Sequence, residues 1–281
     1  LTQRDQAGAA QGAGFSAPSA LQTVELQGQS YAILAASGSN TLTVFRVASD
    51  GSLTPTDHLI DTLSTRFEAA SQLSTARYGD WQLLVAAGSD DGISLLALLP
   101  DGRLLHLDAL ADSPALSLDN PSALAAQVLG NQLQIFASSP SEPGISQMAA
   151  DLSGLGEILQ GTGTGAVLAG GAGRDVLISG GGADRLRGNG GGDMFVFRAE
   201  NAAANGKLGR VLDFNPAEDQ LDLSTLPFLY GLGQITVEST ATGAVLRYQD
   251  YWLQLDRAGG GSLELADFTS QSLLNAQHLS L

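Results

Sequence analysis

The sequence contains no cysteine and only one lysine, Lys207. The absence of cysteine excludes a disulfide framework, thiol catalysis and any Cys-ligated zinc or iron–sulfur site. Basic residues are also few: 13 Lys and Arg stand against 29 Asp and Glu, so the formal net charge is −16. Such a charge repels phosphate groups, and we therefore expect neither nucleic acid nor an anionic membrane surface as a general partner.

Long apolar runs are missing too. The longest, near residues 93–99, is far shorter than the ~20 residues that a transmembrane helix needs. We expect no N-terminal signal peptide, because no basic start leads into an apolar stretch, and the start at Leu1 indicates a processed or partial product. Aromatic residues make up only 6% of the chain, whereas apolar residues reach 43% and glycines number 35. This composition differs from that of disordered chains and predicts an all-β protein with many turns.

Residues 19–160 repeat with a period of about 51 residues. Three strand-like segments share one pattern, at 31–37, 81–87 and 132–138. Each is followed by a turn and a second strand-like segment, at 41–47, 93–99 and 145–151. Asp-Gly pairs at 50–51 and 101–102 then supply the positive φ angles of tight hairpins, and a short further strand follows. We predict about three propeller-like units of four antiparallel strands, preceded by a linker or arm over residues 1–18.

These units resemble the blades of lactonase-like β-propellers. A propeller closes with four to eight blades, so three units leave several arrangements open: further blades elsewhere, copies of the chain that complete a ring together, or a β-sandwich made of hairpins. Exposed blade edges would pair with other chains. We therefore expect a homo-oligomer or a larger surface assembly as one outcome.

The period changes to nine at Gly161. Asp175, Asp184 and Asp193 are nine residues apart, and a large apolar residue follows each Asp by two places. Glycines allow left-handed backbone and turn carbonyl oxygens into the corner, while Asp adds an anionic oxygen; both are ligands that Ca²⁺ prefers. The pattern is identified as the nonapeptide of RTX, or haemolysin-type, calcium-binding proteins. The resemblance implies a short parallel β-roll over residues 161–197, with two nonapeptides in each coil.

The resemblance also implies where Ca²⁺ binds, namely between turns eighteen residues apart. It implies one complete site, formed by Gly171, Gly173, Asp175, Gly188, Gly190 and Asp193. A second site would pair Thr162, Thr164 and Ala166 with Ser179, Gly181 and Asp184; Ala166 stands where the family has Asp, so we expect it weak or empty. A third would start from Gly180, Gly182 and Asp184 and needs a cap from the downstream segment.

The segment 211–224 closely resembles the one that follows the last repeat in proteins exported by type I secretion. The resemblance covers residues 161–281 and implies a β-rich cap and secretion target region over 198–281. Strands are expected there at 234–238, 244–249 and 252–255. It further implies the type I machinery as a partner, an extracellular or cell-surface location in a Gram-negative-type bacterium, and folding on calcium after export. The extreme terminus, 275–281, matches no terminal motif.

Catalytic motifs are missing: the sequence has no His-Glu-x-x-His, no Gly-x-Ser-x-Gly and no phosphate-binding loop. His58, His106 and His278 are scattered, and the pair Asp90-Asp91 is either a solvated turn or a metal contact. Trp81 and Trp252 either pack within strands or stack on sugars. We therefore favour a structural, adhesive or assembly role over an enzyme. Two alternatives stay open: an extracellular lactonase-like hydrolase, and the C-terminal part of a larger exported protein.

Overall fold

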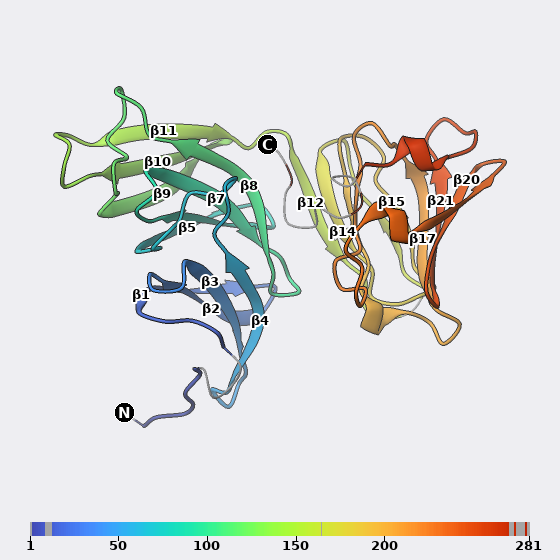
Figure 1. Ribbon diagram of the computed structural model, residues 1–281, viewed down its shortest axis with the longest axis horizontal. Helices are drawn as coiled ribbons and strands as arrows, with labels where there is room; N and C mark the ends of the chain where they lie inside the picture. Colours follow the sequence, from blue (N-terminus) through green and yellow to red (C-terminus); the bar gives the residue numbers. More distant parts are fainter. Residues whose placement is uncertain (1, 9–12, 164, 270–272, 274–278, 280–281) are drawn as a thin grey trace. The chain divides into compact units, whose positions relative to one another are not determined.

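The protein is all-β and falls into two compact units, which include Leu1–Ser153 and Gly154–Ala276 respectively (Figure 1). The computed structural model describes every residue except 1, 9–12, 164, 270–272, 274–278 and 280–281. No described helix is long and apolar enough to cross a membrane. The short helices are single 3₁₀ turns at Ala199–Asn201, Leu232–Gln234 and Leu265–Asp267.

The first unit consists of three antiparallel sheets in chain order. The first sheet contains β1 (Pro18–Leu26), β2 (Gln29–Ala36), β3 (Thr41–Val47) and β4 (Leu53–Ile60). The second contains β5 (Gln72–Tyr78), β6 (Trp81–Ala87), β7 (Gly92–Leu98) and β8 (Leu104–Ala111). The third contains β9 (Ala123–Leu129), β10 (Gln132–Ser138) and β11 (Ser146–Asp151). Strand β1 lies beside β5, and β5 lies beside β9.

The first two sheets repeat one another in detail, which confirms the predicted four-stranded units. A β-bulge interrupts the β3–β4 pairing at Val44/Phe45 and the β7–β8 pairing at Leu95/Leu96. The loops that follow also match: Asp61 accepts a hydrogen bond from the backbone N–H six residues later, at 3.1 Å, and so does Asp112. A bulge that recurs at the equivalent place in two sheets is a specific feature of the repeat unit and not a local irregularity. The 51-residue period therefore describes three-dimensional units.

The third sheet departs from the expected pattern, because it has three strands instead of four. The expected fourth strand exists as β12 (Leu155–Gln160), but it pairs in parallel with β14 of the second unit. The cause is its nonapeptide register: Ile158 aligns with Val176 and Leu159 with Leu177, eighteen residues later. Residues 155–160, which we expected to close the third repeat, instead open the roll.

The N-terminal arm lies on the first sheet. The Asp5 carboxylate accepts a hydrogen bond from the backbone N–H of Leu53 at 2.8 Å. Phe15 packs edge-on against Phe45, with ring centroids 6.2 Å apart. These contacts lend the described part of the segment a fixed conformation although its sequence has no periodicity.

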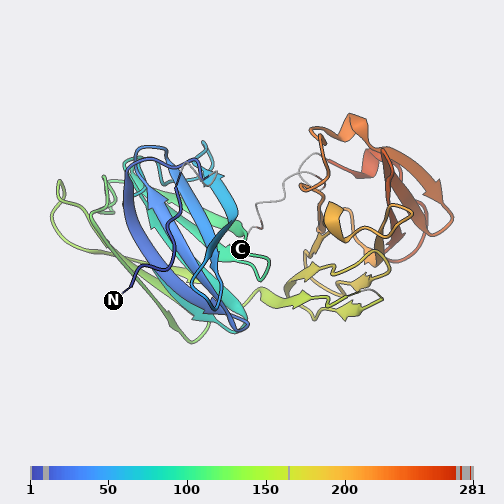
Figure 2. The ribbon, with the colours of Figure 1, turned by 90° about the horizontal axis from the view of Figure 1, so that it is seen from below.

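The second unit is a parallel solenoid with an added antiparallel ribbon (Figure 2). One sheet has the order β12, β14 (Arg174–Ile178), β16 (Met194–Val196) and β18 (Gln220–Asp222). The other begins with β13 (Val167–Ala169), β15 (Arg185–Arg187) and β17 (Lys207–Phe214). It continues through β21 (Tyr251–Arg257), β20 (Gly243–Tyr248) and β19 (Thr236–Thr240), close to the three strands expected after the roll.

The roll has the predicted coil length of eighteen residues. Leu168 lies opposite Leu186 in the β13–β15 pair, and Leu177 lies opposite Phe195 in the β14–β16 pair. Leu177, Leu186 and Phe195 are fully buried and join Val211, Phe214 and Leu221 in one apolar core. Burial of this thin stack is the main apolar contribution that holds the coils together. It also fixes where the intervening turns, and their Asp residues, lie.

Candidate metal centre

A ladder of aspartates runs along one corner of the roll. The Asp193 carboxylate accepts a hydrogen bond from the backbone N–H of Asp175 at 2.9 Å, and Asp219 accepts one from the N–H of Asp193 at 2.9 Å. Asp175 in turn accepts a hydrogen bond from Glu157 in β12. Each carboxylate therefore fixes the coil before it, and successive coils place their carboxylates in one column.

In Asp175 and Asp219 the second carboxylate oxygen closes the turn that precedes the residue. Asp175 Oδ2 accepts from Gly171 N–H at 2.7 Å, and Asp219 Oδ2 accepts from Asn215 N–H at 2.8 Å. A hydrogen bond to an ionised carboxylate is about twice as strong as a neutral one. Asp175 and Asp219 thus each hold their own turn and the neighbouring coil, and both tasks leave lone pairs for a further ligand.

At the turns of Asp175 and Asp193 the carboxylate requires a glycine at the first position of the nonapeptide. A Cβ atom at Gly170 would lie 2.1 Å from Asp175 Oδ2, and one at Gly188 would lie 1.9 Å from Asp193 Oδ2. No side chain fits there. Further along the turn, Gly191 has φ +105°, and a Cβ atom there would lie 2.4 Å from Gly173 O in the preceding coil. The glycine pattern therefore reflects both backbone conformation and close approach.

The structure places the two turns of the site that we expected to be complete beside each other. Gly190 N–H donates to Gly171 O at 3.1 Å, and Asp175 N–H donates to the Asp193 carboxylate. The remaining expected ligands, Gly173 and Gly188, belong to the same two turns. Two carboxylates and several carbonyl oxygens are thereby gathered at one corner, the donor types that Ca²⁺ takes.

The opposite corner carries a single carboxylate, Asp184. It accepts hydrogen bonds from the backbone N–H groups of Gly180 and Gly181 and from the Ser179 hydroxyl, and its Oδ1 accepts from Ala166 N–H at 2.8 Å. Residue 166 is Ala where the other repeats have Asp, so it adds no second carboxylate to this corner. Thr164, expected at this corner, lies outside the described residues.

The expected third site does receive a cap. A Cβ atom at Gly182 would lie 2.1 Å from the carbonyl oxygen of Lys207 in β17, and Arg210 N–H donates to Asp184 O at 3.0 Å. The β15–β17 register pairs Leu186 with Val211, so Gly209 occupies the place of the next Asp. The downstream segment therefore covers this turn without adding an anionic ligand.

Four of the five aspartates that are buried in the described part of the chain have no cationic partner there. Asp175, Asp184, Asp193 and Asp219 have exposed fractions of 0%, 0%, 1% and 4%, and no described Lys or Arg forms an ion pair with any of them. Burial, reinforced by the charges of Asp219, Asp175 and Asp213, raises the pKa of Asp193 to about 7. Burial also raises the pKa of Asp219 to about 7, with Asp213 and Glu218 adding to the effect. A divalent cation would compensate this charge.

Asp219 is the functional candidate that the sequence analysis missed. It continues the carboxylate column, and Leu221, two residues later, continues the apolar column opposite Phe195. The Asp-x-Leu spacing was visible at residues 219–221. The loop after β16, however, lengthens the step from Phe195 to Leu221 to twenty-six residues, which hides the eighteen-residue period.

The described residues contain no group of three or more His, Asp or Glu side chains that converges as a preformed metal site. An ion at the Asp175–Asp193 corner would therefore bind between two carboxylates and backbone carbonyls. His58, in β4, contacts Thr43 at 2.9 Å, and His278 lies outside the described residues. Trp81 is buried, and Trp252 donates to Asn205 O at 3.1 Å. These residues do not assemble a catalytic cluster in the described structure.

Comparison with known families agrees with the geometry of the second unit. Residues 150–259 match the family described as the peptidase M10 serralysin C-terminal domain, and no curated protein matches the chain. The match covers the coils and the ribbon but not the three repeats, so their likeness to lactonase-like blades stays a prediction. Residues 150–259 are thus similar to the serralysin C-terminal domain, which is a β-roll family of RTX type.

Proposed function

We propose that this chain is a secreted calcium-binding protein whose roll folds when Ca²⁺ fills the corner between Asp175 and Asp193. The serralysin-type region indicates an RTX-type secreted protein. The observation that carries the calcium proposal is the column of buried carboxylates without a described cationic partner. Stacked carboxylates repel one another when ionised, and a bound divalent ion turns that repulsion into attraction.

The ligands would be the carboxylates of Asp175 and Asp193 with backbone oxygens of Gly171, Gly173, Gly188 and Gly190. Asp219 would serve the next corner along the same column. Calcium supplies positive charge and flexible oxygen coordination. The protein's own residues supply the turns, which the glycines keep narrow, and the apolar stack, which keeps the corners eighteen residues apart.

This arrangement suits export by the type I machinery. Inside a cell calcium is scarce, and the ionised column opposes folding. Outside, a site with a dissociation constant of ~0.1 mM in ~1 mM calcium stabilises the folded roll by about 1.4 kcal/mol. One or two such sites matter for a thin core. The chain would thus leave the cell unfolded and acquire its roll in the extracellular medium or at the cell surface.

The three repeats would then act as the exported cargo, with a structural, adhesive or assembly role. The observation that favours this role is the edge of the third sheet at β11, which has no partner strand among the described residues. Open edges are sites of strand pairing. Sedimentation of the intact chain with and without calcium tests assembly; a monomer in both conditions, over a wide concentration range, removes that part of the proposal.

Calcium titration followed by circular dichroism tests the roll. We expect added Ca²⁺ to increase the strand signal, and a chelator to reverse the change. Asp175→Asn should lower calcium affinity at least tenfold, the order of magnitude of a lost charged ligand. Asp250→Asn, in an exposed turn of the same unit, is the matched control and should leave affinity unchanged. A roll that stays folded in chelator, with no calcium bound on addition, contradicts the proposal.

A further inference from the structure

The outer edge of β11 has no partner strand among the described residues. In the first two sheets the corresponding edge is covered by β4 and β8, whereas the third sheet ends at β11. Strand β11 has the sequence Ser-Gln-Met-Ala-Ala-Asp, without the Lys or Pro residues that usually protect an edge. The backbone of residues 146–151 is therefore a template for a further strand.

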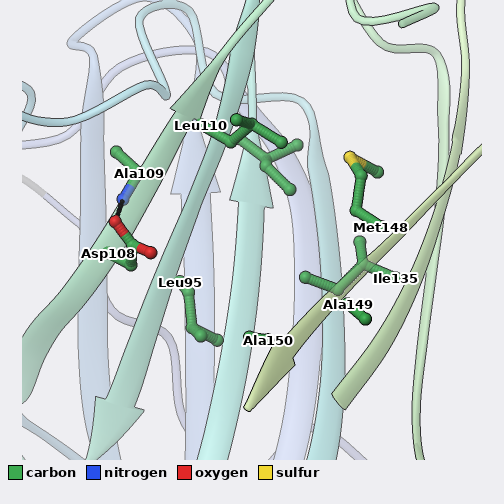
Figure 3. A pocket seen from close by; sticks show the side chains of 9 residues that line it. Leu95, Asp108, Ala109, Leu110, Ile135, Met148, Ala149 and Ala150 are labelled. Carbon is green, nitrogen blue, oxygen red and sulfur yellow. Dashed lines mark hydrogen bonds between the residues drawn. The ribbon is translucent and has the colours of Figure 1, made fainter. Parts of the chain in front are cut away.

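An apolar groove of about 160 Å³ lies beside this edge, between the second and third sheets (Figure 3). Leu95 and Leu110 line it from one side, and Ile135 and Met148 from the other. Comparison with the second sheet shows what is missing. Leu96, opposite Leu84 in β6, is fully buried, whereas Met148, opposite Ile135 in β10, is only half-buried. Leu96 packs in the core of the first two sheets and has β8 beside it, whereas no described strand lies beside Met148 on the outer edge of β11.

The strand with the matching sequence position is β12. The fourth strands of the first two sheets begin at Leu53 and Leu104, and a further step of 51 residues leads to Leu155. The turn before it also begins alike: Ser153 N–H donates to Asp151 Oδ1 at 2.9 Å, as Ser52 N–H does to Asp50 Oδ1 at 2.9 Å. Only residues 152–154 separate the end of β11 from the start of β12.

Residues 155–160 also fit the pairing register of the roll. Glu157 stands eighteen residues before Asp175 and donates its backbone N–H to that carboxylate. Leu155 and Ile158 are buried in this arrangement. Strand β12 thus carries two registers, one inherited from the 51-residue repeat and one from the nonapeptide, and in the structure it satisfies the second.

We propose that the β11 edge and its groove form a docking site for residues 155–160 when the roll is unfolded. The segment then serves as the fourth strand of the third sheet, pairs with β11 and covers Met148. Folding of the roll moves it to β14. The inference rests on the proposed calcium-dependent folding, and Asp175 links the two events because it is both a proposed calcium ligand and the acceptor for Glu157 N–H. The third sheet would keep its edge covered before the roll forms.

Hydrogen exchange of the intact chain, followed by mass spectrometry, tests the proposal. In calcium, peptides covering 146–151 should exchange at their outer edge, and those covering 155–160 and 167–196 should be protected. In chelator, residues 167–196 should lose protection, whereas residues 146–151 should gain it and 155–160 should exchange about tenfold more slowly than 167–196.

Two variants make the outcome specific. Met148→Lys places a charge in the groove and should abolish the chelator-state protection of 155–160 without changing the calcium state. Gln147→Lys, on the opposite face of β11, is the control and should keep that protection. If residues 155–160 exchange as fast as 167–196 in chelator, the docking proposal is wrong. If 167–196 stay protected in chelator, calcium-dependent folding itself fails instead.

Discussion

The carboxylate of Asp193 holds the backbone N–H of Asp175, eighteen residues earlier, at 2.9 Å. The same carboxylate therefore links two successive coils and adds a negative charge to the buried column. A coil cannot adopt its position without bringing its Asp into a buried column of like charges, where burial and neighbouring carboxylates raise the pKa of Asp193 to about 7. The hydrogen bond that holds the coil and the charge that we propose calcium to compensate thus come from a single side chain, and substitutions can separate them.

Asp193→Asn should separate charge from hydrogen bonding. The amide oxygen still accepts from Asp175 N–H, but the charge is lost, so the stabilisation gained on adding calcium should fall from about 1.4 kcal/mol toward zero. Asp193→Ala also removes the acceptor and should destabilise the roll by a further 1–3 kcal/mol or so, with or without calcium. Urea unfolding of both variants in calcium and in chelator measures these differences. Equal calcium responses in wild type and Asp193→Asn would argue against Asp193 as a ligand.

Gly188→Ala should disrupt the corner by steric conflict. Its Cβ atom would lie 1.9 Å from Asp193 Oδ2, so the carboxylate must leave its place in the column. We expect a loss of roughly 2–4 kcal/mol in the unfolding free energy of the roll and weakened calcium binding. Gly231→Ala is the control, because nothing lies within 4 Å of its Cβ position and its φ of −165° suits any residue. Thermal unfolding of the two variants in calcium gives the comparison.

Phe195→Ala should open a cavity in the apolar stack. Phe195 is fully buried, lies opposite Leu177 and Leu221, and contacts Phe214 with ring centroids 6.4 Å apart. Removal of such a ring costs about 3–5 kcal/mol. This loss exceeds the stabilisation of about 1.4 kcal/mol expected from a single calcium site. The variant should therefore need much higher calcium to fold. Phe228→Ala, with its side chain 72% exposed, should change stability little; similar losses in both variants would contradict the assigned core.

The coils of the nonapeptide repeat could be predicted from the sequence because each position of the repeat meets a local structural requirement. Asp175 and Asp193 need glycines at fixed distances along the chain, and Leu177 and Phe195 need to stack, so period and chemistry coincide. Asp219 escaped prediction because a loop, which the local rules allow at any length, separates it from Asp193. A period in the sequence reveals the coils only where the connections between successive coils have the same length.

Strand β12 shows a different limit. Its Leu155 and Ile158 satisfy the spacing of both the repeat and the roll, so the residues alone do not decide which sheet it joins. The contact of Phe15 with Phe45 shows another: a segment without periodicity can still be held by single side chains. In both cases the answer depends on competition between distant partners, which a local pattern does not contain.

The first unit should become less stable as the pH rises through the range in which Asp90 ionises. Burial, reinforced by the charge of Asp61, raises the pKa of Asp90 from its ordinary 3.8 to about 6. The native state therefore binds this proton more tightly than the unfolded state does. The resulting stabilisation is fully present below pH ~4 and is lost as the pH rises through about 6. Screening by solvent at this half-buried group reduces the effect to about 1 kcal/mol.

Asp90→Asn isolates this contribution, because it removes the titrating group and keeps the shape. In a Trp252→Phe background, fluorescence of the buried Trp81 reports unfolding of the first unit alone. Between pH 4 and pH 7 the parent should lose about 1 kcal/mol more stability than Asp90→Asn does, in saturating calcium at both values. Parallel pH dependences of parent and variant would show that Asp90 ionises with its ordinary pKa, and its partly buried position beside Asp61 would then carry no energetic consequence.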